Sequence, residues 1–73
     1  MELRPTTDAD DVTMHELFLD SIAGVYRPHG FDPPAPPLEV FANQQRHVRR
    51  TGVSVAAEDR GRVVGFASVW TRG

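Results

Sequence analysis

The sequence predicts an α+β fold of the order β-α-α-β-β, in which two helices cover an antiparallel sheet. Two segments carry apolar residues at intervals of three and four, which is the spacing of an amphipathic helix. A proline-rich stretch separates them, and the C-terminal part alternates in character around a turn sequence, as β-hairpins do. With 73 residues, the chain forms at most one domain.

Composition narrows the class of function. The chain has no cysteine, which excludes disulfides and thiolate metal sites, and its net charge is −2. Nucleic-acid-binding proteins carry a basic excess that this chain lacks, so no nucleic-acid partner is expected. No apolar run approaches the roughly 20 residues of a membrane span, and the acidic N-terminus does not resemble a signal peptide. We therefore expect a cytoplasmic protein without membrane contact.

The first two elements are a short strand and a long helix. "MELRP" predicts a strand that ends at Pro5, with Leu3 pointing inward. A helix is predicted over 8–26, begun by the Thr7 hydroxyl and by a capping box that Asp10 closes. The residues expected on its buried face are Met14, Leu17, Phe18, Ser21, Ile22 and Val25.

The middle of the chain combines a stiff loop with a second helix. In "RPHGFDPPAPP" five of eleven residues are proline, which predicts an extended loop with no helical turn. A second helix is predicted over 37–51, and Gly52 ends it. The basic run "QQRHVRR" suits either a solvated helix end, which we favour, or a surface for an anion or an acidic partner. The expected buried residues of this helix are Leu38, Phe41, Ala42, Gln45 and Val48.

The C-terminal stretch predicts a hairpin. Two strands are expected within 53–70, joined by "DRG", in which Gly61 can adopt a positive φ. The second strand is apolar on both faces, so we expect it to be covered on both sides. Phe66 and Trp70 are predicted to be among the most buried side chains, and Gly65 is interpreted as permitting close packing.

One short pattern lies inside this hairpin. Residues 62–67, "RVVGFA", fit the text [R/Q]-x-x-G-x-[G/A], which cradles a pyrophosphate in acyl-CoA transferases. Such a cradle needs a loop that follows a strand and opens a helix, because the backbone N–H groups must point at the phosphates. Val63, Val64 and Phe66 favour a strand, so we prefer the interpretation of a buried strand to that of a phosphate site.

The loop between the helices carries the best candidates for a binding site. Tyr26, Arg27, His29 and Phe31 crowd this loop, and such groups on a rigid scaffold suit a small polar ligand. Alternatively, the two aromatic side chains fill the space between the helices, and the sequence leaves both interpretations open. No triad of serine, histidine and acid is suggested by the spacing.

The histidines do not predict a metal site. His15, His29 and His47 lie in three different elements, and no carboxylate stands beside any of them at ligand spacing. His15 is expected to face the solvent, and His47 to lie at a helix end.

The opening "ELRPTTDADD" and the hairpin "VAAEDRGRVVGFASVW" resemble the N-terminal half of the GNAT superfamily of acyl-CoA-dependent N-acyltransferases. The resemblance implies that residues 1–73 are a single partial domain, the acceptor-side half of a GNAT-like domain, with the cofactor-binding half absent. It implies that Tyr26, Arg27, His29 and Phe31 line the acceptor pocket. Acetyl-CoA is the cofactor of a complete family member, and this chain holds no cofactor-binding, catalytic or metal-binding position.

Two functions are therefore expected of this sequence. The first is the N-terminal portion of an N-acetyltransferase, which would transfer an acetyl group from acetyl-CoA to a small-molecule or peptide amine and is inactive as the 73-residue chain. The alternative is a small non-enzymatic interaction module. It would pair through the exposed sheet edge over 63–71 with a partner strand or with a second copy of itself.

Overall fold

The computed structural model describes residues 1–70 of the chain, with Trp70 by its backbone alone. The elements follow the predicted order, and the prediction of an α+β fold with two helices and an antiparallel sheet is confirmed. They are β1 (Glu2–Pro5), α1 (Asp11–Tyr26), α2 (Leu38–Thr51), β2 (Gly52–Asp59) and β3 (Arg62–Trp70), with short 3-10 turns at Asp8–Asp10 and Arg27–His29.

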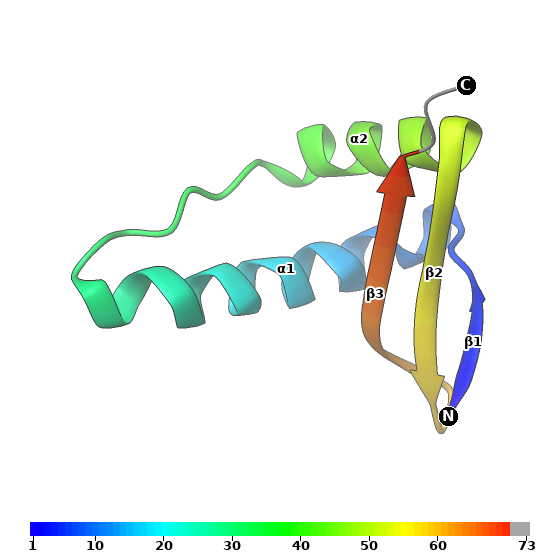
Figure 1. Cartoon of the computed structure of the whole chain (residues 1–73), viewed down its shortest axis with the longest axis horizontal. Coiled ribbons are helices and arrows are strands. Elements are labelled where there is room, and N and C mark those ends of the chain that lie inside the picture. Colours follow the sequence, from blue (N-terminus) through cyan, green and yellow to red (C-terminus); the bar gives the residue numbers. More distant parts are fainter. Residues whose placement is uncertain (71–73) are drawn as a thin grey trace.

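The sheet has three strands in the order β1-β2-β3, and both pairs are antiparallel. In the register of β2, Ala56 lies opposite Phe66 of β3, and Ala57 lies opposite Leu3 of β1. Both helices lie on one side of the sheet, and α1 continues well past the outer side of β3 (Figure 1). The sheet is therefore covered on one face and has β3 at its edge.

The start of the first helix follows the predicted capping chemistry. The backbone N–H of Thr7 donates to the Asp10 carboxylate at 2.8 Å, which is the reciprocal half of a capping box. The first turn, Asp8–Asp10, is a 3-10 turn, and the α-helix begins at Asp11. A tight first turn is common where a helix begins, so the predicted start is confirmed to within this turn.

The predicted apolar face of α1 is buried only in its first half. Met14 is fully buried, and Phe18 and Ile22 are half-buried. Val25 is 62% exposed, and Ser21 is exposed as well. The face is continuous along the helix, but within residues 1–70 the sheet beneath it ends at β3, so no described strand lies under the last turns.

The proline-rich loop was predicted to contain no helical turn, and this is wrong for its first residues. Arg27–His29 forms a 3-10 turn, because a proline in the first turn of a helix needs no N–H partner and already has a helical φ. Gly30, with φ of 81°, ends the turn, and its N–H donates to the Arg27 carbonyl at 3.0 Å. The residues over 31–37 are extended, as expected.

The second helix buries the middle of its predicted face. Phe41, Gln45 and Val48 are buried, and Ala42 is half-buried. Leu38 was expected among them but is 40% exposed, because it begins the helix at the end that lies away from the sheet.

Phe41 is the centre of the aromatic core. Its ring lies 5.6 Å from that of Phe18, 6.2 Å from that of Phe66, and 5.2 Å from the imidazole of His15. His15 was expected to face the solvent, and this is wrong: it is half-buried, with Nε2 at 2.8 Å from the Pro36 carbonyl oxygen. The proline loop folds back over α1 and supplies this polar partner.

The far face of the sheet carries apolar side chains without a cover. Leu3, predicted to point inward, is 75% exposed, and Val69 is 61% exposed. The prediction that β3 is buried on both sides is therefore wrong. Alternation along a strand shows which residues share a face, but it does not show whether another layer covers that face. Within residues 1–70 both helices pack on the other face of the sheet, away from Leu3 and Val69.

The turn between β2 and β3 consists of two residues with positive φ, Arg60 at 53° and Gly61 at 76°. Asp59 and Arg62 face each other in the register, so the loop is as short as an antiparallel hairpin allows. The prediction for Gly61 is confirmed. Arg60, by contrast, is not a glycine, and residues with a side chain rarely adopt a positive backbone φ.

This turn gives a stability prediction. Arg60→Asn should raise the free energy of unfolding by about 0.5–1 kcal/mol, because asparagine tolerates positive φ better than arginine. Gly61→Ala should lower it by about 1 kcal/mol, since alanine is strained at such a φ. The measurement is the midpoint of urea denaturation for both variants. An unchanged or lower midpoint for Arg60→Asn would contradict the assigned turn.

Candidate functional site

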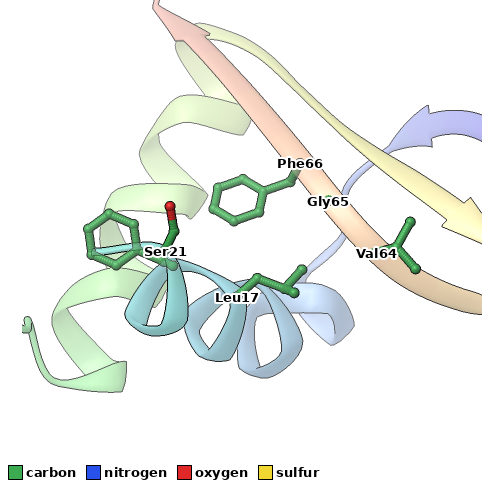
Figure 2. A pocket seen from close by; sticks show the side chains of 6 residues that line it. Leu17, Ser21, Val64, Gly65 and Phe66 are labelled. Carbon is green, nitrogen blue, oxygen red and sulfur yellow. The ribbon is translucent and has the colours of Figure 1, made fainter. Parts of the chain in front are cut away.

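A cavity of about 300 Å³ lies between α1 and the edge strand β3, and we call it the edge groove. Apolar side chains dominate its lining residues, and Ser21 contributes the one polar side chain among them. Figure 2 shows the side chains of Leu17 and Ser21 rising from the helix toward Phe66 on the strand. The residues that line it are Leu17, Phe18, Ser21, Val64, Gly65 and Phe66.

A β-bulge shapes the strand side of the edge groove. Gly65 lies opposite Ala57, while Val63 lies opposite Glu58, so Val64 has no partner on β2. An extra residue of this kind bends a strand and interrupts its alternation. Gly65 was interpreted as permitting close packing, and this is wrong, because a Cβ built there meets no atom within 4 Å.

Phe66 forms the inner wall of the groove. It was predicted to be among the most buried side chains, but it is only half-buried. One edge of its ring packs against Phe41 in a T-shaped contact, and the rest faces the cavity. The same prediction for Trp70 concerns a side chain outside the described residues.

The four loop candidates lie away from the edge groove. Tyr26 ends α1, Arg27 and His29 form the following 3-10 turn, and Phe31 comes just after it. All four are exposed, Phe31 by 65%, so the two aromatic side chains do not fill the space between the helices. They lie at the far end of α1 from the sheet (Figure 1), and their role as acceptor contacts stays a prediction.

Two arginines hold the start of α1 against the rest of the fold. Arg49 of α2 forms a bidentate pair with Asp11, at 2.9 Å for both contacts, and reaches Asp8 at 2.6 Å. The Arg49 side chain is only 15% exposed, so the interpretation of the basic run as a solvated helix end is wrong for this residue. It is confirmed for Arg46, His47 and Arg50, which are exposed. Hydrogen bonds from Arg49 to these carboxylates, Asp11 foremost, raise the pKa of Arg49 above its usual value.

Arg4 of β1 makes the second cluster. Its guanidinium binds both oxygens of Asp10, at 2.8 and 2.9 Å, and donates to Glu58 at 2.7 Å. These hydrogen bonds hold the pKa of Asp10 at about 2, below its ordinary 3.8, and raise the pKa of Arg4. One strand residue thereby fixes both the helix start and the hairpin.

The depressed pKa of Asp10 predicts an acid-dependent stability. A carboxyl whose pKa is lower in the folded chain stabilises it above the unfolded pKa and loses that contribution as the pH falls through the folded pKa. The free energy of unfolding should therefore fall by roughly 2 kcal/mol between about pH 4 and pH 2 from this group alone. Denaturant titrations across this window, with Asp10→Asn as the comparison, measure it. An Asp10→Asn variant as acid-sensitive as the parent chain would exclude this origin.

A row of hydrogen-bonded polar side chains crosses the sheet beneath α2. Thr6 Oγ1 donates to Ser54 Oγ at 2.9 Å, Ser54 Oγ lies 3.1 Å from Ser68 Oγ, and Ser68 donates to Gln45 Oε1 at 3.2 Å. Arg49 donates to Thr6 at the other end, at 3.3 Å. Among the described residues every buried side-chain polar atom has a partner, so this row is a satisfied scaffold rather than a reactive site.

Residues 62–67, the pattern that resembled a phosphate cradle, lie within β3. A strand that pairs along one side does not direct consecutive N–H groups at one anion, so these residues do not fit the pyrophosphate of acetyl-CoA. Over residues 1–70 no group of three or more histidine or acidic side chains is arranged to hold a metal ion. None of the helices in that range has the length and apolar character needed to cross a membrane.

No protein-family model, curated protein or solved structure matches the chain.

Sequence reasoning did not find the edge groove. Leu17 and Phe18 were predicted to lie on the buried face of the helix. Nothing in the pair Val63-Val64 indicates that Val64 is the unpaired residue of a bulge. The bulge next to Gly65 could have been inferred from the sequence, since an isolated glycine in a strand often marks a bulge.

Proposed function

We propose that this chain is the acceptor-side part of an N-acetyltransferase of the GNAT type, and that it transfers no acetyl group as the 73-residue chain. The observation that carries the proposal is the open edge groove beside β3, on a β-α-α-β-β frame of the order that the resemblance implies. In this proposal the groove, or the loop over 26–31 at the far end of α1, binds and orients an amine, and the groups that hold acetyl-CoA are not among residues 1–70.

The groove suits an amine with an apolar body. Its apolar side chains can contact such a body, and the Ser21 hydroxyl offers the polar contact on the helix side. Glu16 and Asp20 of α1 are exposed and do not line the groove, and their negative charge attracts a cationic amine from a distance. Residues 62–67 match the sequence pattern of a phosphate-binding loop but lie in a strand and do not fit a phosphate, so no step through acetyl-CoA is assigned to this chain.

The test is an NMR titration of the ¹⁵N-labelled chain with phenethylamine, with N-acetyl-phenethylamine as the matched uncharged compound. The amine should shift the amide signals of Leu17, Ser21 and Gly65, and the acetylated compound should shift them several-fold less. Asp20→Asn should weaken the response to the amine, while Asp32→Asn, the same charge change in the distal loop, should not. Shifts centred on Arg27 and His29 would assign the acceptor to the loop instead and would also support the proposal.

Two outcomes would overturn it. One is the absence of any shift with phenethylamine up to about 10 mM, a concentration that detects even very weak binding. The other is stoichiometric, micromolar binding of acetyl-CoA to the chain in a calorimetric titration, which would place the cofactor site within these residues.

A further inference from the structure

The outer side of β3 offers an unpaired strand edge. Within residues 1–70 β3 pairs only with β2, so its other side presents free N–H and C=O groups. Val64 and Val69 are 48% and 61% exposed, and Arg62 is the one charged residue of the strand. An edge of this length and character is a template for another strand.

The molecule exposes more surface than a compact chain of its size. The accessible surface is 5410 Å², about 900 Å² more than a compact chain of 8.1 kDa exposes. The radius of gyration is 13.0 Å, against about 11 Å for a compact domain of this length. The excess is close to the roughly 800 Å² that one partner contributes to a standard protein interface.

The helix layer already covers the place where a fourth strand would lie. α1 extends past the outer side of β3 (Figure 1), and Val25 and Tyr26 on its last turn are exposed. The edge groove opens between this overhang and β3, with room for one or two large apolar side chains. A single added strand would therefore meet backbone partners on β3 and an apolar floor on α1.

Charge decides which strand fits. Arg62 is exposed at the start of the edge, and among the described residues it makes no ion pair, although Asp59 is its register partner. In a second copy paired antiparallel through β3, the strand brings no acidic residue to Arg62. The overhanging helices of the two copies would also meet beneath the joined sheets. A strand that ends in an acidic residue has neither difficulty.

We propose that the edge of β3 binds an extended segment of another protein as an antiparallel fourth strand, with a large apolar side chain in the edge groove and an acidic residue beside Arg62. The antiparallel direction places the acidic residue at the C-terminal end of the segment. The inference concerns the occupant of the edge and does not rest on the proposed acetyltransferase role.

The probe is the blocked peptide STVTLTVE, titrated into the chain by calorimetry and by NMR. Binding should protect the β3 amides that do not donate to β2 from hydrogen exchange. The peptide STVTLTVK should bind about tenfold more weakly, and STVPLPVE, which lacks two backbone donors, should not bind measurably. Arg62→Glu should reverse the preference toward STVTLTVK, whereas Arg60→Glu, the same change in the neighbouring turn, should leave the preference intact.

The outcomes separate this proposal from its rivals. No binding of STVTLTVE at about 1 mM would overturn it, and so would equal binding of the acidic and basic peptides. A concentration-dependent dimer in sedimentation, with the β3 edge amides protected in the absence of peptide, would also overturn it by assigning the edge to a second copy. None of these results bears on the amine titration, so the two proposals fail independently.

Discussion

Replacing Phe41 with alanine should leave the chain largely unfolded at room temperature. Phe41 is 3% exposed and packs against three rings, those of His15 and Phe18 on α1 and that of Phe66 on β3. Removal of a buried phenylalanine costs about 3–5 kcal/mol, and a domain of this size has a net stability of only roughly 3–5 kcal/mol. Circular dichroism and urea denaturation measure the loss.

Two matched variants test the interpretation of this loss. Phe66→Ala should cost clearly less, about 1–2 kcal/mol, because one side of that ring already faces the edge groove. Phe31→Ala, at a 65% exposed position, should change stability by less than about 0.5 kcal/mol. Equal losses at Phe41 and Phe66 would mean that the groove is closed in solution.

The second large effect is expected at Arg49. Arg49→Met leaves the Asp11 carboxylate, 5% exposed as a residue, without its bidentate partner. Breaking one side of such a buried pair costs about 3 kcal/mol, most of it from the uncompensated charge. Arg50→Met, at an exposed position on the same helix, is the control and should be close to neutral.

A double variant distinguishes lost charge pairing from lost packing. Arg49→Met combined with Asp11→Leu removes both charges and should recover most of the stability, because a buried ion pair replaced by apolar groups is often neutral. A double variant as unstable as Arg49→Met alone would show that the guanidinium acts through its other partners, Thr6 and Asp8.

Features set by local chemistry could be predicted from the sequence. Thr7 and Asp10 are three positions apart before an apolar run, and they meet in the structure as a capping pair. Gly61 closes the turn sequence Asp59-Arg60-Gly61 and has the expected positive φ. In both cases the deciding contacts lie within a few residues, so the sequence contains all the required information.

Features set by distant contacts could not be predicted. Leu3 points away from the core because β1 pairs with β2 in a register that no local pattern specifies. His15 is half-buried because the proline loop returns over it, and Arg49 is paired because α2 ends beside the start of α1. The placement of Tyr26 and its neighbours at the far end of α1 depends in the same way on where the sheet ends.

The polar row beneath α2 has a consequence for strand slippage. A shift of β3 by one residue against β2 would move Ser68 to the opposite face, and a shift by two would keep the face but place an apolar side chain against Ser54. The alternation of faces is kept in the second shift, so the pattern of apolar residues alone does not oppose it. The hydroxyls do oppose it, because Ser54 and Gln45 would then lose their hydrogen bonds to Ser68. The row of polar side chains therefore favours one register of β3 on β2 among those that the pattern of apolar residues alone permits.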